Sequence, residues 1–176
     1  MFRIAKITAW PIVPVALTLG VVAITACGDQ AAQEEAAANP LLGAWSMTAI
    51  TADDGTMIEP SQSGLFIFTE DHYSAVYSLG ADPRPLSATA FAPTSDEMVA
   101  QYQTIIVNTG TYDVSGSTIT YRPMVAKSAG FVGGHSTMDY AIDGNTLTLN
   151  TTSVVSADGM SPPTALSETI RLRRIE

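Results

Sequence analysis

Apolar and polar residues alternate along short segments from residue 42 to the end of the chain, and Gly, Asp and Pro residues separate these segments. A period of two is typical of strands with one buried face, and short links between such segments favour hairpins. Ser115-Gly116 is one such link, because Gly readily adopts the positive φ of a two-residue turn. The pattern predicts eight strands, at 42–51, 64–69, 73–79, 110–114, 117–126, 135–142, 146–152 and 165–175. Successive strands joined mostly by hairpins predict an all-β fold, an eight-stranded up-and-down antiparallel barrel.

One segment, 94–106, departs from this alternation and predicts a single short helix. Its large apolar residues recur at helical spacing: Met98, Tyr102, Ile105 and Ile106. Thr94 followed three residues later by Glu97 fits a capping box at the helix start. The helix is entered from the proline-rich loop 81–93. Beside a barrel, such a helix either covers an opening or an edge, or acts as a lid.

The first 27 residues have the order of a secretory signal: Arg3 and Lys6, an uncharged apolar stretch over 7–26, and then Cys27. The apolar stretch is also long enough to be an uncleaved membrane anchor. The sequence "ITAC" that ends at Cys27 resembles the lipobox of bacterial lipoproteins, in which a branched apolar residue and two small residues precede cysteine. The resemblance implies that residues 1–26 are a signal peptide and that Cys27 becomes a lipidated N-terminus. Several acyl chains on one residue anchor a protein stably.

Residues 27–38 contain Ala, Gln and acidic residues but no large apolar side chain, so we interpret them as a flexible tether before a domain at 39–176. Gly28 follows the lipidated position, where lipoproteins retained at the inner membrane often carry Asp. The resemblance therefore implies a lipid-anchored protein of the cell envelope, at the outer membrane and facing the periplasm in a diderm bacterium.

Charge and cysteine content exclude two classes of interaction. Without Arg3 and Lys6, the chain keeps six basic and 17 acidic residues, a net charge of −11. Such a surface repels nucleic acid, so we expect no nucleic-acid partner. A single cysteine excludes an intrachain disulfide.

The segment 39–56, "NPLLGAWSMTAITADDGT", resembles the opening of the bacterial and fungal lipocalin-like domain family, in which a leucine pair, Gly, a small residue and Trp begin the first strand. The later segments "GLFIFTEDHYSAV", "NTGTYDVSGSTITY", "MDYAIDGNTLTL" and "IRLRRIE" follow in the order of that family, so that the resemblance covers about residues 39–176. It implies a barrel that binds or carries a small apolar or amphipathic molecule. The chain departs from the family at Tyr121 and Arg122, where histidines are frequent, and at Met138, where the family has arginine.

Trp45 in "GAW" resembles the glycine-x-tryptophan of lipocalins, in which an arginine of the last strand packs over the indole at the closed end of the barrel. We expect Arg173 to be this partner, with Arg171 and Arg174 as the alternatives. The pairing is an architectural one, formed by packing and a cation–π contact.

Alternation places several tyrosines on the apolar faces of their strands, where their rings would provide apolar walls with polar tips. The predicted ligand-binding residues are Tyr77, Tyr112, Tyr121, Tyr140, Arg122, His135, Met47 and Met138. A small eight-stranded barrel either holds one small ligand or is filled by side chains, and the same residues suit both cases.

The chain offers little catalytic or metal-binding chemistry. The two histidines, His72 and His135, have no neighbouring metal ligands, and neither a nucleophile elbow nor a phosphate-binding loop is present. We therefore predict no catalytic residue, metal or cofactor.

Three functions remain in order of preference. The first is a tethered monomeric carrier of a small apolar or amphipathic ligand. The second is a barrel with a filled core whose loops 81–93 and 151–165 bind another envelope protein. The third is a cofactor-free cavity isomerase or cyclase in which His135, with Arg122 or Tyr121, transfers protons.

Overall fold

The computed structural model describes residues 39–162 and 168–176. The chain divides into two units, and all described residues belong to the second, Ala38–Glu176. The predicted signal peptide, lipidated Cys27 and tether lie outside the described residues. No helix within 39–162 or 168–176 combines the length and apolar character that a membrane span needs.

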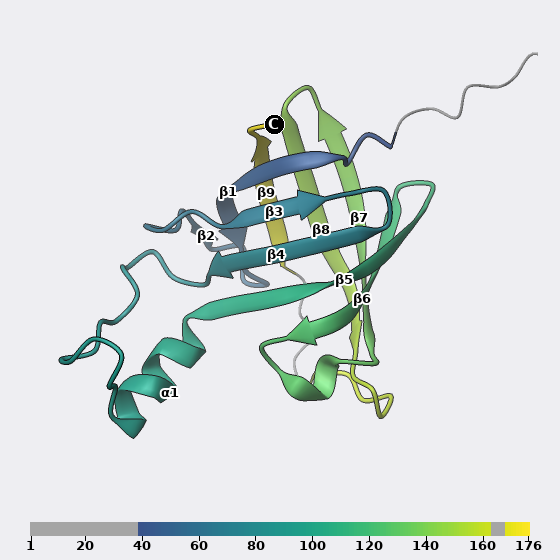
Figure 1. Ribbon diagram of the computed structural model, residues 1–176. Coiled ribbons are helices and arrows are strands. Elements are labelled where there is room, and N and C mark those ends of the chain that lie inside the picture. The colour runs from purple at the N-terminus through teal and green to yellow at the C-terminus, as the bar shows by residue number, and fades with distance from the viewer. Residues whose placement is uncertain (1–38, 163–167) are drawn as a thin grey trace, which may run out of the picture. The chain divides into compact units, whose positions relative to one another are not determined.

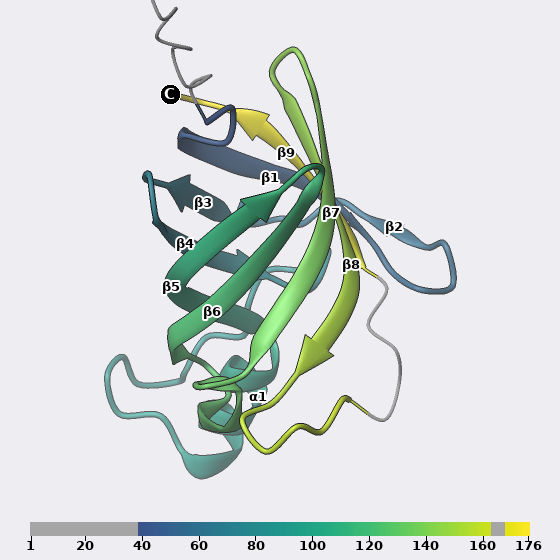
Figure 2. The same cartoon turned by 90° about the vertical axis from the view of Figure 1, so that its right-hand side faces the viewer.

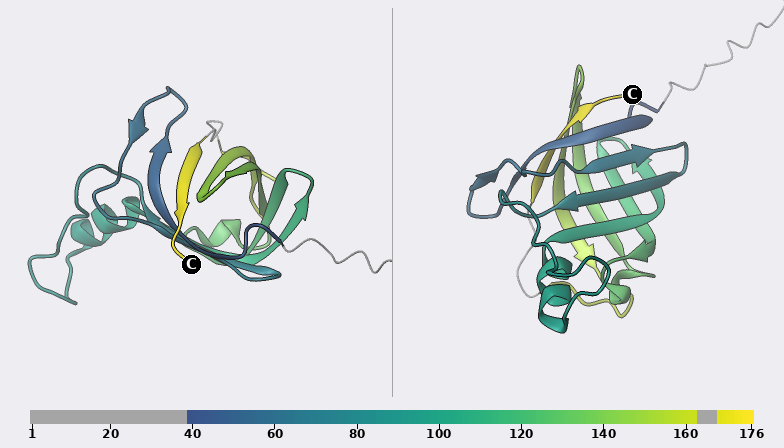
Figure 3. Two further views of the ribbon diagram at one scale, coloured as in Figure 1. Left: turned by 90° about the horizontal axis from the view of Figure 1, so that it is seen from above. Right: turned by 60° about the vertical axis from the view of Figure 1, so that its left-hand side comes forward.

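The second unit is a closed eight-stranded antiparallel barrel, as predicted. Its elements are β1 (Gly43–Thr51), β2 (Met57–Ile58), β3 (Leu65–Phe68), β4 (His72–Ser78), α1 (Ser95–Gln103), β5 (Ile105–Ser115), β6 (Thr118–Ala126), the 3₁₀ helix η1 (Ala129–Phe131), β7 (His135–Asp143), β8 (Thr146–Val155) and β9 (Thr169–Arg174). The strands pair in the order β1-β3-β4-β5-β6-β7-β8-β9, and β9 pairs back onto β1. Seen from above, these strands form a ring (Figure 3, left), while the short β2 pairs with β1 outside it.

Helix α1 begins as predicted but ends earlier. The N–H of Glu97 donates to Thr94 Oγ1 at 3.3 Å, and the N–H of Thr94 donates to Glu97 Oε2 at 2.7 Å, which completes the capping box. Ile105 and Ile106, expected in the helix, instead begin β5 and pair with Ser78 and Tyr77 of β4. The prediction was wrong here because the backbone groups at this edge of β4 obtain their hydrogen-bond partners from these residues.

Two further segments differ from the predicted boundaries. Strand β8 extends to Val155, so the first part of the expected loop 151–165 is strand. The last strand runs from Thr169 to Arg174, so Glu168 and Ile175, both expected in it, lie outside it.

The two ends of the barrel have different connections. One end, called here the closed end, carries the three hairpin turns β3–β4, β5–β6 and β7–β8 together with Asn39 and the C-terminus. The other, called here the open end, carries the connection that contains β2, the loop 79–94 with α1, the turn with η1, and the segment after β8. Figures 1 and 2 show α1 and η1 at the opposite end from the C-terminus.

Aromatic side chains fill the barrel towards the closed end. Phe68 and Tyr112 lie edge to face with ring centroids 5.4 Å apart, and Tyr73 and Tyr121 lie 4.4 Å apart. Buried aliphatic residues of the last two strands complete this core: Leu147, Leu149, Ile170 and Leu172. This part of the barrel is therefore packed by its own side chains.

Trp45 closes the barrel with an arginine of the last strand, but the partner is Arg174 rather than the predicted Arg173. The guanidinium carbon of Arg174 lies 4.1 Å from the centre of the fully buried indole ring. Strand alternation places Ile170 and Leu172 inward and leaves Arg171 and Arg173 exposed, and the β1–β9 register sets Arg174 opposite Trp45. The correction follows from this register.

Candidate ligand-binding cavity

A cavity of about 470 Å³ lies at the open end of the barrel. Its lining residues are Tyr77, Ile106, Val107, Asn108, Ala126, Lys127, Ser128, Gly130, Phe131, Ser136, Met138, Thr151, Val154, Ser156, Met160, Ser161, Pro162 and Glu168. The volume falls within the range of small-molecule sites, about 300–1,000 Å³. The barrel is thus packed towards one end and hollow towards the other.

The cavity exists because β6 and β7 separate as they approach the open end. They pair only from Thr118 to Tyr121 of β6, while β5 pairs with β6 and β8 pairs with β7 well beyond that point. The 3₁₀ helix η1 lies at this opening, and the carbonyl of its Gly130 accepts a hydrogen bond from the N–H of Ala157 at 3.1 Å. A side chain at Gly134 would clash with the carbonyl oxygen of Val155, so glycine allows the turn to approach β8 closely.

Four polar side chains line the cavity near the open ends of their strands: Asn108 of β5, Ser136 of β7, Thr151 of β8 and Glu168 just before β9. Each occupies an inward-facing position; Thr151, for example, follows the buried Leu147 and Leu149 at spacings of two. On β8 the inward-facing side chains therefore change from Leu147 and Leu149 to Thr151 towards the open end. Alternation along each strand places these side chains inward, so the sequence pattern contains a signal for them.

Burial raises the pKa of two groups that line the cavity, Glu168 and Tyr77. Burial, with a contribution from the charge of Asp53, raises the pKa of Glu168 above its ordinary value. Burial and the nearby Glu168 likewise raise the pKa of the Tyr77 hydroxyl. The ion pairs within the described parts of the chain are Asp71–His72 and Asp113–Arg122, so no described cation forms an ion pair with Glu168.

Lys127 is the one base among the described lining residues, and it also contacts α1. Its ammonium lies 4.7 Å from the centre of the Tyr102 ring, and the Tyr102 hydroxyl donates to the Lys127 carbonyl at 3.1 Å. No residue of α1 lines the cavity, and none of its side chains is buried. The helix therefore lies beside the opening and does not cover it as a lid.

A second, smaller cavity of about 30 Å³ adjoins the main one. Its lining residues are Phe66, Tyr73, Ala75, Tyr77, Ile106, Asn108, Tyr121, Ser136, Met138 and Ile170. Half of these also line the main cavity, and the others belong to the aromatic core. The small cavity therefore lies between the main cavity and the core.

Three of the eight predicted ligand-binding residues line these cavities. Tyr77 and Met138 line both, and Tyr121 lines the smaller one. Met47 is buried in the core, and Tyr140 packs against the core partly buried, so neither lines a cavity.

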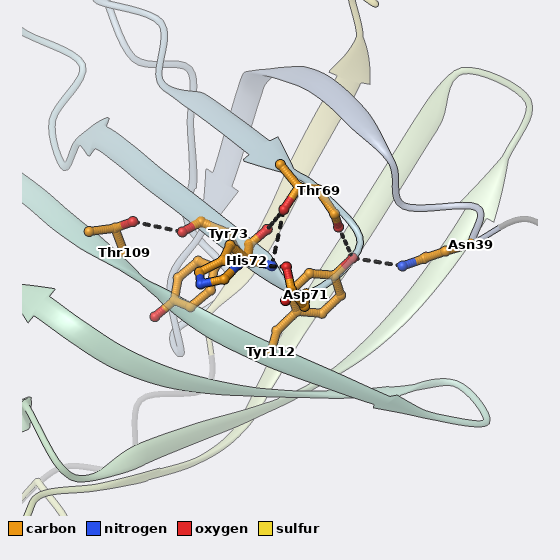
Figure 4. Close-up of polar contacts among 7 residues, drawn as sticks. All are labelled: Asn39, Thr69, Asp71, His72, Tyr73, Thr109 and Tyr112. Atoms are coloured by element: carbon orange, nitrogen blue, oxygen red, sulfur yellow. Dashed lines mark hydrogen bonds and ion pairs between the residues drawn. The ribbon is translucent and has the colours of Figure 1, made fainter.

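Tyr112, also predicted to bind ligand, instead holds the closed end together (Figure 4). Its hydroxyl donates to the Thr69 carbonyl at 2.6 Å and accepts from Asn39 Nδ2 at 2.6 Å. The neighbouring His72 and Asp71 side chains contact each other at 2.6 Å on the exposed hairpin turn. These contacts are architectural and lie away from the cavity.

Arg122 and His135, also predicted to bind ligand, do not line either cavity. Arg122 is exposed and its Nη1 pairs with Asp113 Oδ2, because it follows the inward-facing Tyr121 and must point outward. His135 immediately precedes the inward-facing Ser136 and does not line the cavity. The proton-transfer group expected for a cavity enzyme is therefore not assembled.

The geometry does not point to a metal site, and known proteins add no assignment. Across 39–162 and 168–176, no three or more His, Cys, Asp or Glu side chains gather in a way that could hold a metal ion. The chain matches no family model, no curated protein and no solved structure.

Proposed function

We propose that this barrel binds or carries a small apolar or amphipathic molecule in the open-end cavity. One observation carries the proposal, the cavity of about 470 Å³ with apolar walls and inward-facing polar side chains. Small-molecule sites combine these two features, because apolar walls supply affinity and a few polar groups set orientation.

The expected affinity is moderate. Burial of about 200 Å² of apolar ligand surface at roughly 25 cal/mol per Å² is worth about 5 kcal/mol. Association offsets part of this gain through lost translational and rotational freedom. A gain of at most about 5 kcal/mol corresponds to a dissociation constant of about 0.2 mM or weaker for a simple alkyl ligand, and polar contacts would strengthen binding.

We further propose that the barrel is tethered to the cell envelope through lipidated Cys27. The support comes from the sequence alone, from the "ITAC" pattern and the acidic segment 27–38. A tethered carrier would remain next to a membrane, the main store of apolar molecules in a cell.

Titration with a fluorescent apolar dye, followed by displacement with alkyl alcohols and ketones, tests the binding proposal. Thr151→Leu adds bulk on the cavity wall and should weaken binding about tenfold or more. Thr152→Leu is the matched control, because Thr152 is exposed on the outer face of the same strand. Equal effects of the two substitutions would place the ligand elsewhere. Absence of any binding up to about 1 mM, where binding is worth only about 4 kcal/mol, would reject the proposal.

A second function, binding of another envelope protein, is favoured by loop 81–93. Leu86 and Phe91 of this loop are 90% and 104% exposed. Phe91 also has a φ of 61°, a conformation that costs energy in residues other than glycine. Native mass spectrometry of the extracted protein separates the two functions, since a small molecule supports the carrier and a stoichiometric protein supports the interaction module.

A further inference from the structure

Tyr121, which lines the small cavity, carries a buried polar group, its hydroxyl. Its oxygen is buried and has no hydrogen-bond partner among the described residues. Tyr121 lines the small cavity, together with Asn108 and Ser136, which also line the main one. The unpartnered hydroxyl therefore belongs to a residue of the small cavity, which shares half of its lining residues with the main one.

The Tyr121 hydroxyl acts as a donor at neutral pH. Burial raises the pKa of Tyr121 well above its usual value, and the neighbouring tyrosines contribute less to the same effect. The hydroxyl therefore keeps its proton. The nearby Tyr73 hydroxyl already donates to Asn108 Oδ1 at 2.8 Å. Asn108 therefore presents its amide nitrogen, a donor, as its remaining polar group, and Ser136 adds a hydroxyl. The small cavity is therefore lined by these three donor groups and by no carboxylate among the described lining residues, although the hydroxyl oxygens also accept hydrogen bonds.

The size of the small cavity limits what it can accept. Its volume of about 30 Å³ exceeds the roughly 10–15 Å³ that one water molecule needs, so it has room for a water molecule or for one oxygen atom of a ligand. A ligand oxygen there would replace a water molecule, which is favourable when it reproduces the hydrogen bond of that water.

The charge of the surroundings decides between a neutral oxygen and a carboxylate. Glu168 lines the main cavity, and Lys127, the one base among the described lining residues, does not line the small cavity. A carboxylate placed beside Tyr121 would be buried without a cation, which is costly. A carbonyl oxygen accepts the same hydrogen bonds without this cost.

We propose that the small cavity is a subsite for one neutral hydrogen-bond-accepting oxygen, a ketone, ester or aldehyde carbonyl at the end of an apolar ligand, with Tyr121 as its donor. The inference rests on the proposed carrier function, because it names the ligand class of the same cavity.

Displacement titrations on purified wild-type and Tyr121→Phe protein test it, with octane, methyl hexyl ketone and octanoate as probes. Tyr121→Phe keeps the ring and removes only the hydroxyl. It should weaken ketone binding about three- to tenfold, the range of one neutral hydrogen bond, and leave octane binding unchanged. Octanoate should bind wild-type protein more weakly than the ketone does. The affinity of each probe is compared between the two proteins, so differences in hydrophobicity among the probes do not affect the result.

Tyr112→Phe is the matched control, because it removes a hydroxyl bonded at the closed end. It should lower stability without changing the ratio of ketone to octane affinity, whereas Tyr121→Phe should not lower stability. An unchanged ketone affinity in Tyr121→Phe, or tighter binding of octanoate than of ketone, overturns the subsite while the carrier function stands. If neither octane nor ketone binds, the carrier function fails and the subsite with it.

Discussion

Replacement of Arg174 by alanine should destabilise the barrel strongly, although the side chain lies at the end of the last strand. The guanidinium covers the Trp45 indole, and it also donates from Nη1 to the Leu42 carbonyl at 2.5 Å and from Nη2 to the Pro40 carbonyl at 2.6 Å. Arg174 therefore ties the segment before β1 to β9. Its removal breaks the cation–π contact and both hydrogen bonds together.

The magnitude follows from these contacts. A cation–π contact over tryptophan is worth about 0.5–2 kcal/mol. A hydrogen bond to a charged group contributes about 1.5–3 kcal/mol. Pro40 is exposed, so in the variant water can bind its carbonyl and replace part of this contribution. We expect the free energy of unfolding to fall by about 2–4 kcal/mol, since contributions of neighbouring contacts overlap. For a domain of this size, such a loss lowers Tm by roughly 10 °C.

Urea unfolding followed by tryptophan fluorescence measures the effect. Residues 39–176 contain one tryptophan, Trp45, and its indole Nε1 donates to the Leu41 carbonyl at 2.8 Å in a fully buried site. Folded wild-type protein should emit at short wavelength, and Arg174→Ala should shift that emission to the red because one face of the ring loses its cover. Arg173→Ala is the matched control, since Arg173 is exposed on the outer face of β9.

Two results would contradict this reasoning. A loss within about 0.5 kcal/mol for Arg174→Ala, the usual range of surface substitutions, would show that the guanidinium contributes no net stability. An equal loss of unfolding free energy in Arg173→Ala would show that removal of any arginine from β9 destabilises the barrel, whether or not it contacts Trp45.

Three further predictions concern other parts of the chain. Cys27→Ser should abolish partition of the protein into detergent, and continued partition would identify the apolar stretch 7–26 as the anchor. Folded protein retains the proton of Glu168 to higher pH than unfolded protein does, so stability should fall as pH rises just above the ordinary glutamate pKa. The urea midpoint, measured at several pH values, should fall less with rising pH in Glu168→Gln than in wild-type protein. An equal fall in the two proteins would show that Glu168 does not cause the pH dependence. Thr94→Ala removes the cap of α1, which costs about 0.5–2 kcal/mol locally. Hydrogen exchange should accelerate in α1 but not in the barrel, because α1 buries no side chain; an unchanged rate would mean that the cap is unimportant.

Local interactions made several features predictable from the sequence. The capping box joins residues three apart, so Thr94 and Glu97 specify the start of α1 without help from the rest of the chain. Gly116, with a φ of 59°, likewise specifies the turn between β5 and β6. The same holds for the inward faces of Tyr77 and Tyr121, since the period of two is a property of each strand alone. Applied strictly, it would also have placed Arg122 outside, because adjacent residues of a strand face opposite ways.

Pairing between distant strands decided the remaining features. Arg174 rather than Arg173 covers Trp45 because the register between β1 and β9 sets them opposite, and that register changes at an irregularity between Met47 and Ala49. Ile105 and Ile106 suit a helix by their spacing, yet they join the sheet because β4 offers them hydrogen-bond partners. The cavity depends on the point at which β6 and β7 separate and on η1 at the opening. A hydrophobic pattern records which face of a strand is inward, but the volume enclosed by those faces depends on how all eight strands close.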